Sequence, residues 1–137
     1  MTCMNEGQTT GRCLCGAVRF AFEGPLNWTC HCHCESCRRA TSSPMTSFLG
    51  VPLQTFRWTG EAPKVFRSSP GVERLFCGKC GSQMAFLAEH YPGEIHLYAA
   101  SLDDPEAFEA EMHVHHEERL AWFETTDNLP RKVGFAD

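Results

Sequence analysis

Cysteine is the residue with which this chain could do metal chemistry, because nine cysteines occur in only 137 residues. An odd count that includes Cys-x-Cys steps fits metal ligation better than disulfide pairing. Zinc prefers four thiolate or imidazole ligands, and such ligands usually arrive in close pairs on tight turns. Three groups have this spacing: Cys13-Leu14-Cys15, the run from Cys30 to Cys37, and Cys77-Gly78-Lys79-Cys80.

The outer two groups predict one closed, structural zinc site. Cys77 and Cys80 form a close pair, and the glycine that follows each of them leaves the backbone free to fold around an ion. In an extended segment the side chains of Cys13 and Cys15 point to the same side, so both sulfurs can reach one ion. The two pairs together supply four thiolates, which closes the coordination sphere.

The central run predicts a second zinc, bound by Cys32, Cys34 and Cys37. In an extended strand Cys30 would lie about 13 Å from Cys34, too far for one tetrahedral ion. Three thiolates with a vacant fourth position are the arrangement of a reactive zinc, so these three cysteines are the candidate catalytic residues. The alternative is that Cys30 or a histidine closes the site. We therefore expect two zinc ions per chain.

The histidines of this run alternate with its cysteines. His31 and His33 should point to the opposite face, which favours packing or hydrogen bonding over metal ligation. Cys3 lies in a polar stretch, residues 1–10, that we expect to be a flexible tail with a free thiol. The remaining residues, 11–137, read as a single domain.

The elements that must position these cysteines are mainly β-strands. β-Branched and aromatic residues alternate with polar ones in short segments, as around Phe20 and Leu97. Pro-Gly pairs in residues 69–72 and 91–94 predict type II turns, each joining two antiparallel strands. The expected fold is mainly β, with compact antiparallel sheets stapled by zinc and at most one short helix.

Two further elements are expected near the C-terminal end. Asp104 can cap a short helix and Pro105 can take its first position, so a helix is predicted at Asp104–Phe108. A strand at Met112–His116 should follow. His113 and His115 would share one face of that strand, where they are either acid–base groups near pH 7 or simply exposed side chains.

Composition excludes several classes of function. The net charge of −5 argues against a duplex nucleic-acid binder that relies on neutralising phosphates. The first residues have no basic and apolar leader pattern, and no later run approaches about 20 apolar residues, so neither export nor a membrane span is expected. We expect a cytoplasmic protein, where a reducing environment disfavours the alternative of a disulfide-bonded secreted domain.

Taken together, the motifs resemble those of the glutathione-dependent formaldehyde-activating enzyme (GFA) family, which is related to centromere protein V. The resemblance runs from Gly11 to about Gly134 and rests on the jointly spaced cysteine groups. It implies a compact fold of the β-tent type, with the same division of the cysteines into structural and catalytic ligands. The matching segments are Gly11-x-Cys13-x-Cys15-Gly16-x-Val18-x-Phe20, Cys32-His33-Cys34-x2-Cys37-Arg38-Arg39, Phe76-Cys77-x2-Cys80-Gly81-Ser82 and Ser101-Leu102-Asp103-Asp104-Pro105.

The activity that the resemblance implies is reversible carbon–sulfur chemistry, in which a thiol such as glutathione adds to formaldehyde. The protein would then be a zinc-dependent carbon–sulfur lyase with a small thiol as its partner, and glutathione is one candidate. Arg38 and Arg39 directly follow the last ligand and could bind a substrate carboxylate, or else lie solvated at the surface. Two rival functions stay open at this point: a non-catalytic zinc-stabilised binding module, and a sensor of thiols or metals.

Overall fold

The computed structural model of the protein describes residues 7–135 and is mainly β, with ten strands and a single α-helix. The strands are β1 Gln8–Arg12, β2 Arg19–Glu23, β3 Trp28–Cys32, β4 Thr46–Pro52, β5 Phe56–Trp58, β6 Lys64–Ser69, β7 Val72–Phe76, β8 Gln83–Ala88, β9 Glu94–Tyr98 and β10 His113–Val114, and the helix is α1 Glu35–Thr41. This confirms the predicted fold class. Within the described residues, no helix is long and apolar enough to cross a membrane.

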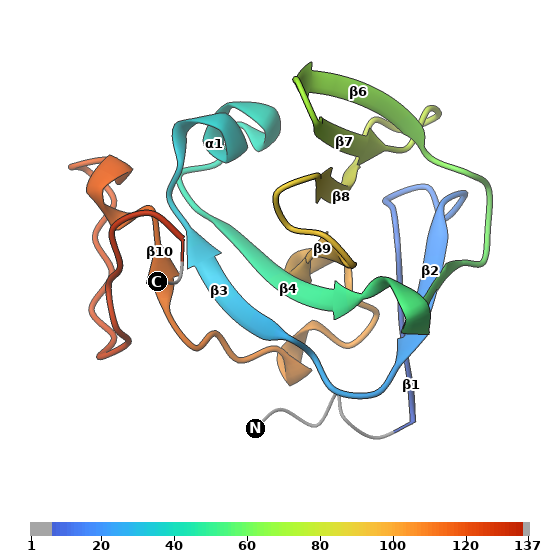
Figure 1. Cartoon of the computed structure of the whole chain (residues 1–137), viewed down its shortest axis with the longest axis horizontal. Helices are drawn as coiled ribbons and strands as arrows, with labels where there is room; N and C mark the ends of the chain where they lie inside the picture. Colours follow the sequence, from blue (N-terminus) through green and yellow to red (C-terminus); the bar gives the residue numbers. More distant parts are fainter. Residues whose placement is uncertain (1–6, 136–137) are drawn as a thin grey trace.

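The strands form two sheets (Figure 1). The smaller has the order β1-β2-β5 and the larger the order β10-β3-β4-β9-β8-β7-β6. Every pair of neighbouring strands is antiparallel except β10 and β3, which run parallel. The two Pro-Gly turns join β6 to β7 and β8 to β9, as predicted, and their glycines Gly71 and Gly93 adopt positive φ.

The larger sheet has one face for the core and one for the candidate site. Leu49 pairs with Leu97, and both are fully buried in the main core, which includes Phe20 and Phe22 of the small sheet. The residues next to them in sequence point the other way, because side chains alternate along a strand. A second cluster therefore forms on the opposite face, with Phe48 and Tyr98 beside Cys30, Cys32 and Cys37.

Three sequence expectations are corrected. β1 begins at Gln8, before the expected domain start at Gly11, because residues 8–10 pair with β2. The helix expected at Asp104–Phe108 is only a 3-10 turn, Pro105–Ala107. The strand expected at Met112–His116 is reduced to His113–Val114, because His115 adopts the left-handed conformation with φ of 52°. Cys3 lies outside the described residues.

The α-helix lies in the cysteine run instead. Cys34 occupies the N-cap position of α1, and its sulfur accepts the backbone N–H of Cys37 at 3.3 Å. At the other end Ser42 takes a left-handed conformation and closes the last turn. The helix therefore brings the second and third cysteines of the run close together.

Candidate metal centres

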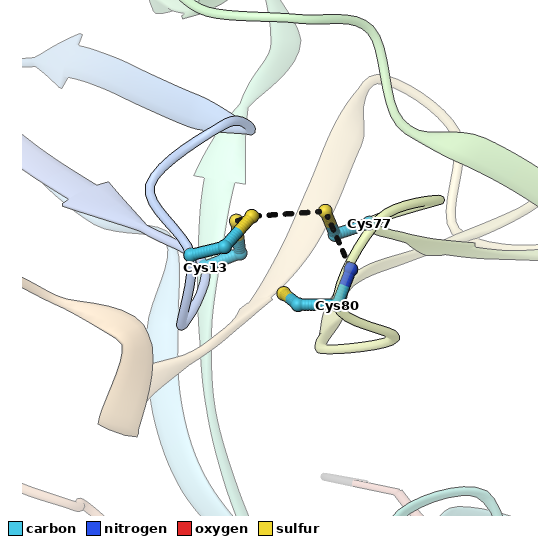
Figure 2. Close-up of side chains that lie close together, drawn as sticks. Cys13, Cys77 and Cys80 are labelled. Carbon is cyan, nitrogen blue, oxygen red and sulfur yellow. Dashed lines mark hydrogen bonds between the residues drawn. The ribbon is translucent and has the colours of Figure 1, made fainter.

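The four-cysteine group joins two hairpin ends that are distant in sequence. Cys13 and Cys15 lie in the turn after β1, not in an extended segment as expected, and Cys77 and Cys80 lie in the connection from β7 to β8. Figure 2 shows the two loops facing each other with their sulfurs pointing inward. All four sulfurs lie within 4.8 Å of one another, so the sequence prediction that these cysteines meet is confirmed.

The spacing of these sulfurs fits a tetrahedral zinc ion. A Zn–S bond of about 2.3 Å sets neighbouring sulfurs about 3.8 Å apart. The Cys13–Cys15 and Cys15–Cys77 sulfur separations are 3.7 and 3.8 Å. The amides of Val18 and Lys79 donate to the sulfurs of Cys13 and Cys77, each at 3.3 Å. Such donors stabilise thiolates, the form that a metal binds.

Ser82 supports the same group from its exposed side. Its hydroxyl lies 3.2 Å from the sulfur of Cys80 and its Oγ accepts the amide of Leu14 from the facing loop. The hydrogen bond from Ser82, together with backbone donors, lowers the pKa of Cys80 to about 5. The loops are thus arranged around at least one thiolate.

The second group consists of Cys32, Cys34 and Cys37, which we call the trio. Cys32 ends β3, while the other two cysteines lie at the start of α1. Their three sulfurs also lie within 4.8 Å of one another, and in residues 7–135 no fourth ligand atom from Cys, His, Asp or Glu joins them. Cys30 is fully buried on β3 and stands outside the group, as expected, and burial raises the pKa of its thiol.

A buried arginine that sequence reasoning missed lies beside the trio. Arg74, on β7, is only 7% exposed, and its Nη1 lies 3.8 Å from the sulfur of Cys37. The thiols of Cys32 and Cys34 and the Arg74 guanidinium hold the pKa of Cys37 at about 3, against the effect of burial. No carboxylate of the described residues pairs with Arg74. Its counter-charge is therefore the sulfur cluster itself.

The trio opens onto a cavity of about 360 Å³, which we call the aromatic cavity. Trp28, Phe86, Tyr91, His96 and Phe135 contribute to its walls. A neighbouring hollow of about 480 Å³, which we call the arginine hollow because Arg39 and Arg74 line it, shares with the aromatic cavity the residues Ser36, Ser68 and Arg74. The trio itself lines only the aromatic cavity, and the shared residues connect that cavity with the arginine hollow.

The two arginines that follow the trio in sequence are not part of the aromatic cavity. Arg39 forms an ion pair with Glu35, at 2.8 Å on the exposed face of α1, and lines the arginine hollow. The Nε of Arg38 is buried without a hydrogen-bond partner in the described residues. A role for either one in binding a substrate carboxylate stays a prediction.

A hydrogen-bonded chain links two buried histidines, His33 and His113, to Asp127. His33 Nε2 is 2.8 Å from His113 Nδ1, and His113 Nε2 is 3.0 Å from a carboxylate oxygen of Asp127. His31 bonds Ser47 at 2.8 Å, so both histidines of the run hydrogen-bond as expected. His113 is completely buried, contrary to the reading of an exposed side chain. The backbone of His115 is left-handed, so this histidine does not share a face with His113. It lines the aromatic cavity instead.

These two cysteine groups coincide with the region that known proteins share with this chain. The sequence profile described as glutathione-dependent formaldehyde-activating enzyme matches residues 8–118. The chain belongs to the GFA family. This confirms the resemblance inferred from the cysteine motifs, and the matched region includes every cysteine of both groups.

Relatives in the GFA family carry names that agree with the match. An uncharacterized lyase of Schizosaccharomyces pombe is 36% identical over 78 residues, covering 56% of this chain and 55% of the relative. A putative glutathione-dependent formaldehyde-activating enzyme of Halomonas elongata is 29% identical over 102 residues, covering 68% of this chain and 64% of the relative. The chain thus matches less than two-thirds of the length of either protein.

One solved structure shares the fold of this chain. The crystal structure of a Rhodobacter sphaeroides protein superposes with a TM-score of 0.57 at 24% identity, covering 69% of this chain and 87% of that protein. At this identity the likeness shows the fold alone. In this chain the four-cysteine group and the trio could each hold a metal ion.

Proposed function

We propose that the protein is a zinc-dependent carbon–sulfur lyase that acts reversibly on a thiol–aldehyde adduct such as S-hydroxymethylglutathione. The observation that carries the proposal is the trio, whose three sulfurs converge with no fourth protein ligand among residues 7–135 and open onto a cavity. The GFA family and the relatives named as a lyase and as a formaldehyde-activating enzyme support it.

The roles of the two cysteine groups follow from their surroundings. Cys13, Cys15, Cys77 and Cys80 would hold a structural zinc that ties two loops together. The trio would hold the catalytic zinc, which lowers the pKa of a bound thiol so that it reacts as a thiolate. In the forward reaction a C–S bond forms, the carbonyl π bond breaks, and the thiol proton ends on the carbonyl oxygen. No oxidant or reductant is needed.

Arg74 balances charge at the trio. Three thiolates and one Zn²⁺ sum to a single negative charge, and the guanidinium beside Cys37 offsets it in a buried position where charges interact strongly. A thiolate substrate bound beside the trio would add negative charge, part of which the same cation would offset. Arg74 would thus favour the thiolate form of the substrate.

The two arginines of the arginine hollow suit the carboxylates of glutathione. The lining of this hollow includes Arg39 and Arg74 and contains no acidic residue, so an anion that extends from the trio would meet positive charge. Arg38, which does not line it, is assigned no contact here. Free thiols persist in reducing compartments, so we place the proposed activity in the cytoplasm.

The test compares the wild-type protein with Cys34→Ser. We expect two zinc ions per wild-type chain by elemental analysis and one in the variant, because the variant lacks a ligand of the trio. The variant should stay folded, because the trio spans six residues and its ion closes little chain. Formaldehyde is mixed with glutathione, and separately with other small thiols, and adduct formation is followed by NMR exchange. Since the uncatalysed reaction is fast, only acceleration above the rate with the variant counts.

The expected result is acceleration by the wild type and none by a folded Cys34→Ser protein. If the wild type holds two zinc ions but matches the variant with every thiol, the lyase proposal is wrong. The chain would then be better explained as a zinc-stabilised binding module.

A further inference from the structure

Aromatic rings build the wall of the aromatic cavity around one buried histidine. The centroid of the His96 ring lies 4.5 Å from that of Trp28, 5.2 Å from Phe86 and 5.1 Å from Tyr91. Phe135, near the C-terminal end, stacks on the same histidine at 6.1 Å. All five residues line the cavity onto which the trio opens.

The pairing of the strands fixes these rings in one row. Trp28 on β3 pairs with Gly50 on β4, Gly50 pairs with His96 on β9, and His96 pairs with Phe86 on β8. The indole N–H of Trp28 and Nε2 of His96 both bond the same carboxylate oxygen of Glu94, at 3.0 and 2.8 Å. The two rings are thus held in place by hydrogen bonds within the protein itself.

The aromatic cavity and the arginine hollow differ in the residues that line them. Arg74 lies between them, because it lines both and its guanidinium sits 5.1 Å from the centroid of the Phe86 ring. The arginine hollow adds Arg39 to Arg74, while the aromatic cavity adds the flat ring faces of Trp28, Phe86 and Tyr91. An apolar group gains about 25 cal/mol for each Å² that it buries. Formaldehyde, with a single carbon, has almost no surface with which to use these walls.

We propose that the aromatic cavity binds the organic group of an aryl aldehyde, so that the preferred substrate is the adduct of a thiol with such an aldehyde. The proposal rests on the lyase activity proposed above and names its substrate class. The thiol adds to the aldehyde carbon, the C–S bond forms as the carbonyl π bond breaks, and the thiol proton ends on the oxygen. The product is a hemithioacetal, and the reverse step releases the thiol and the aldehyde.

The first test compares benzaldehyde with formaldehyde, each mixed with glutathione and the metal-loaded wild-type protein. Acceleration above the uncatalysed rate is measured by NMR exchange. We expect kcat/KM to be about tenfold or more higher for benzaldehyde, the size of effect that an apolar pocket gives. A rate for formaldehyde that equals or exceeds the rate for benzaldehyde overturns the proposal while leaving the lyase activity intact.

The second test fills the cavity. Val72, on β7, lines it, so Val72→Phe should lower kcat/KM for benzaldehyde about tenfold more than it lowers kcat/KM for formaldehyde. Val65→Phe is the matched control, since Val65 lies on β6, 44% exposed and outside the cavity. An equal loss with both aldehydes, or no loss with either, contradicts the proposal.

A binding measurement separates the site from turnover. Benzyl alcohol has the aryl group but no aldehyde, so it cannot form an adduct. Calorimetry should show that it binds to the wild type and to Val65→Phe, and that it binds about tenfold more weakly to Val72→Phe. If no aldehyde reacts but this pattern holds, the lyase proposal fails and the aryl site stands. Absence of binding to the wild type overturns the aryl site itself.

Discussion

The indole ring of Trp28 lies directly over Gly50 on the neighbouring strand. A Cβ atom at position 50 would come within 2.6 Å of the indole Nε1. The missing side chain lets a residue of β3 reach across β4 and donate its N–H to Glu94 on β9 at 3.0 Å. One glycine thus allows three strands to share a single hydrogen-bonded wall of the aromatic cavity.

Gly50→Ala should therefore destabilise the protein by about 1–3 kcal/mol, because the indole must leave its place and its bond to Glu94. Urea unfolding measures the change. In a Trp28→Ala background the same substitution should cost clearly less, since the ring that it strikes is absent. An equal cost in both backgrounds would show that the contact is not the cause.

Cys77→Ser should unfold or aggregate the protein. The ion shared by the two loops closes about 60 residues of chain, and structural zinc contributes several kcal/mol to folding. Far-ultraviolet circular dichroism and elemental analysis provide the measurement. Cys30→Ala is the matched control, because Cys30 is buried but belongs to neither group, and it should stay folded with two zinc ions. Soluble Cys77→Ser protein with its full zinc content is the contrary result.

Arg74→Gln should lower kcat/KM for glutathione about 10–100-fold, because a charge-assisted contact of about 1.5–3 kcal/mol beside Cys37 is lost. Arg74→Lys keeps the charge and should recover part of the loss. The control is Arg67→Gln, whose arginine makes only an exposed ion pair with Glu73 on the neighbouring strand. Unchanged kinetics in a folded Arg74→Gln protein would contradict a role for this cation.

The Asp127 carboxylate should contribute pH-dependent stability. Its hydrogen bond with His113, helped by the amide of Leu129, holds its pKa at about 2, below the ordinary value of 3.8. A lowered pKa means that the stabilisation is present above pH 3.8 and is lost as the pH falls toward 2. Asp127→Asn should therefore unfold more easily than the wild type at neutral pH, and the gap between them should close in acid. A gap that is independent of pH would refute this reading.

Local sequence signals predicted the parts of the molecule that depend on short spacings. Cys77 and Cys80 are close in the chain, so their pairing around an ion requires only a tight turn. Alternating residues around Phe20 and Leu97 predicted strands because one face of each strand packs in the core. Pro-Gly pairs predicted the two turns because glycine tolerates the positive φ that they need.

Features that depend on distant pairing could not be read in this way. Arg74 meets Cys37 only because the fold brings β7 beside α1, although three strands separate β7 from β3 within the sheet. The helix α1 escaped notice because a cysteine, not a serine or aspartate, caps it. Left-handed backbone is usually found at glycine or asparagine, and position 115 is a histidine. The sequence therefore predicted that the strand at Met112–His116 would extend further than β10 does.

The most direct test is a crystal structure of the zinc-loaded protein soaked with glutathione, with anomalous scattering recorded at the zinc edge. We predict two ions: one enclosed by Cys13, Cys15, Cys77 and Cys80, the other bound by Cys32, Cys34 and Cys37 with the glutathione sulfur as its fourth ligand. A second ion closed by Cys30 or by a histidine, or glutathione bound away from both ions, would contradict the account.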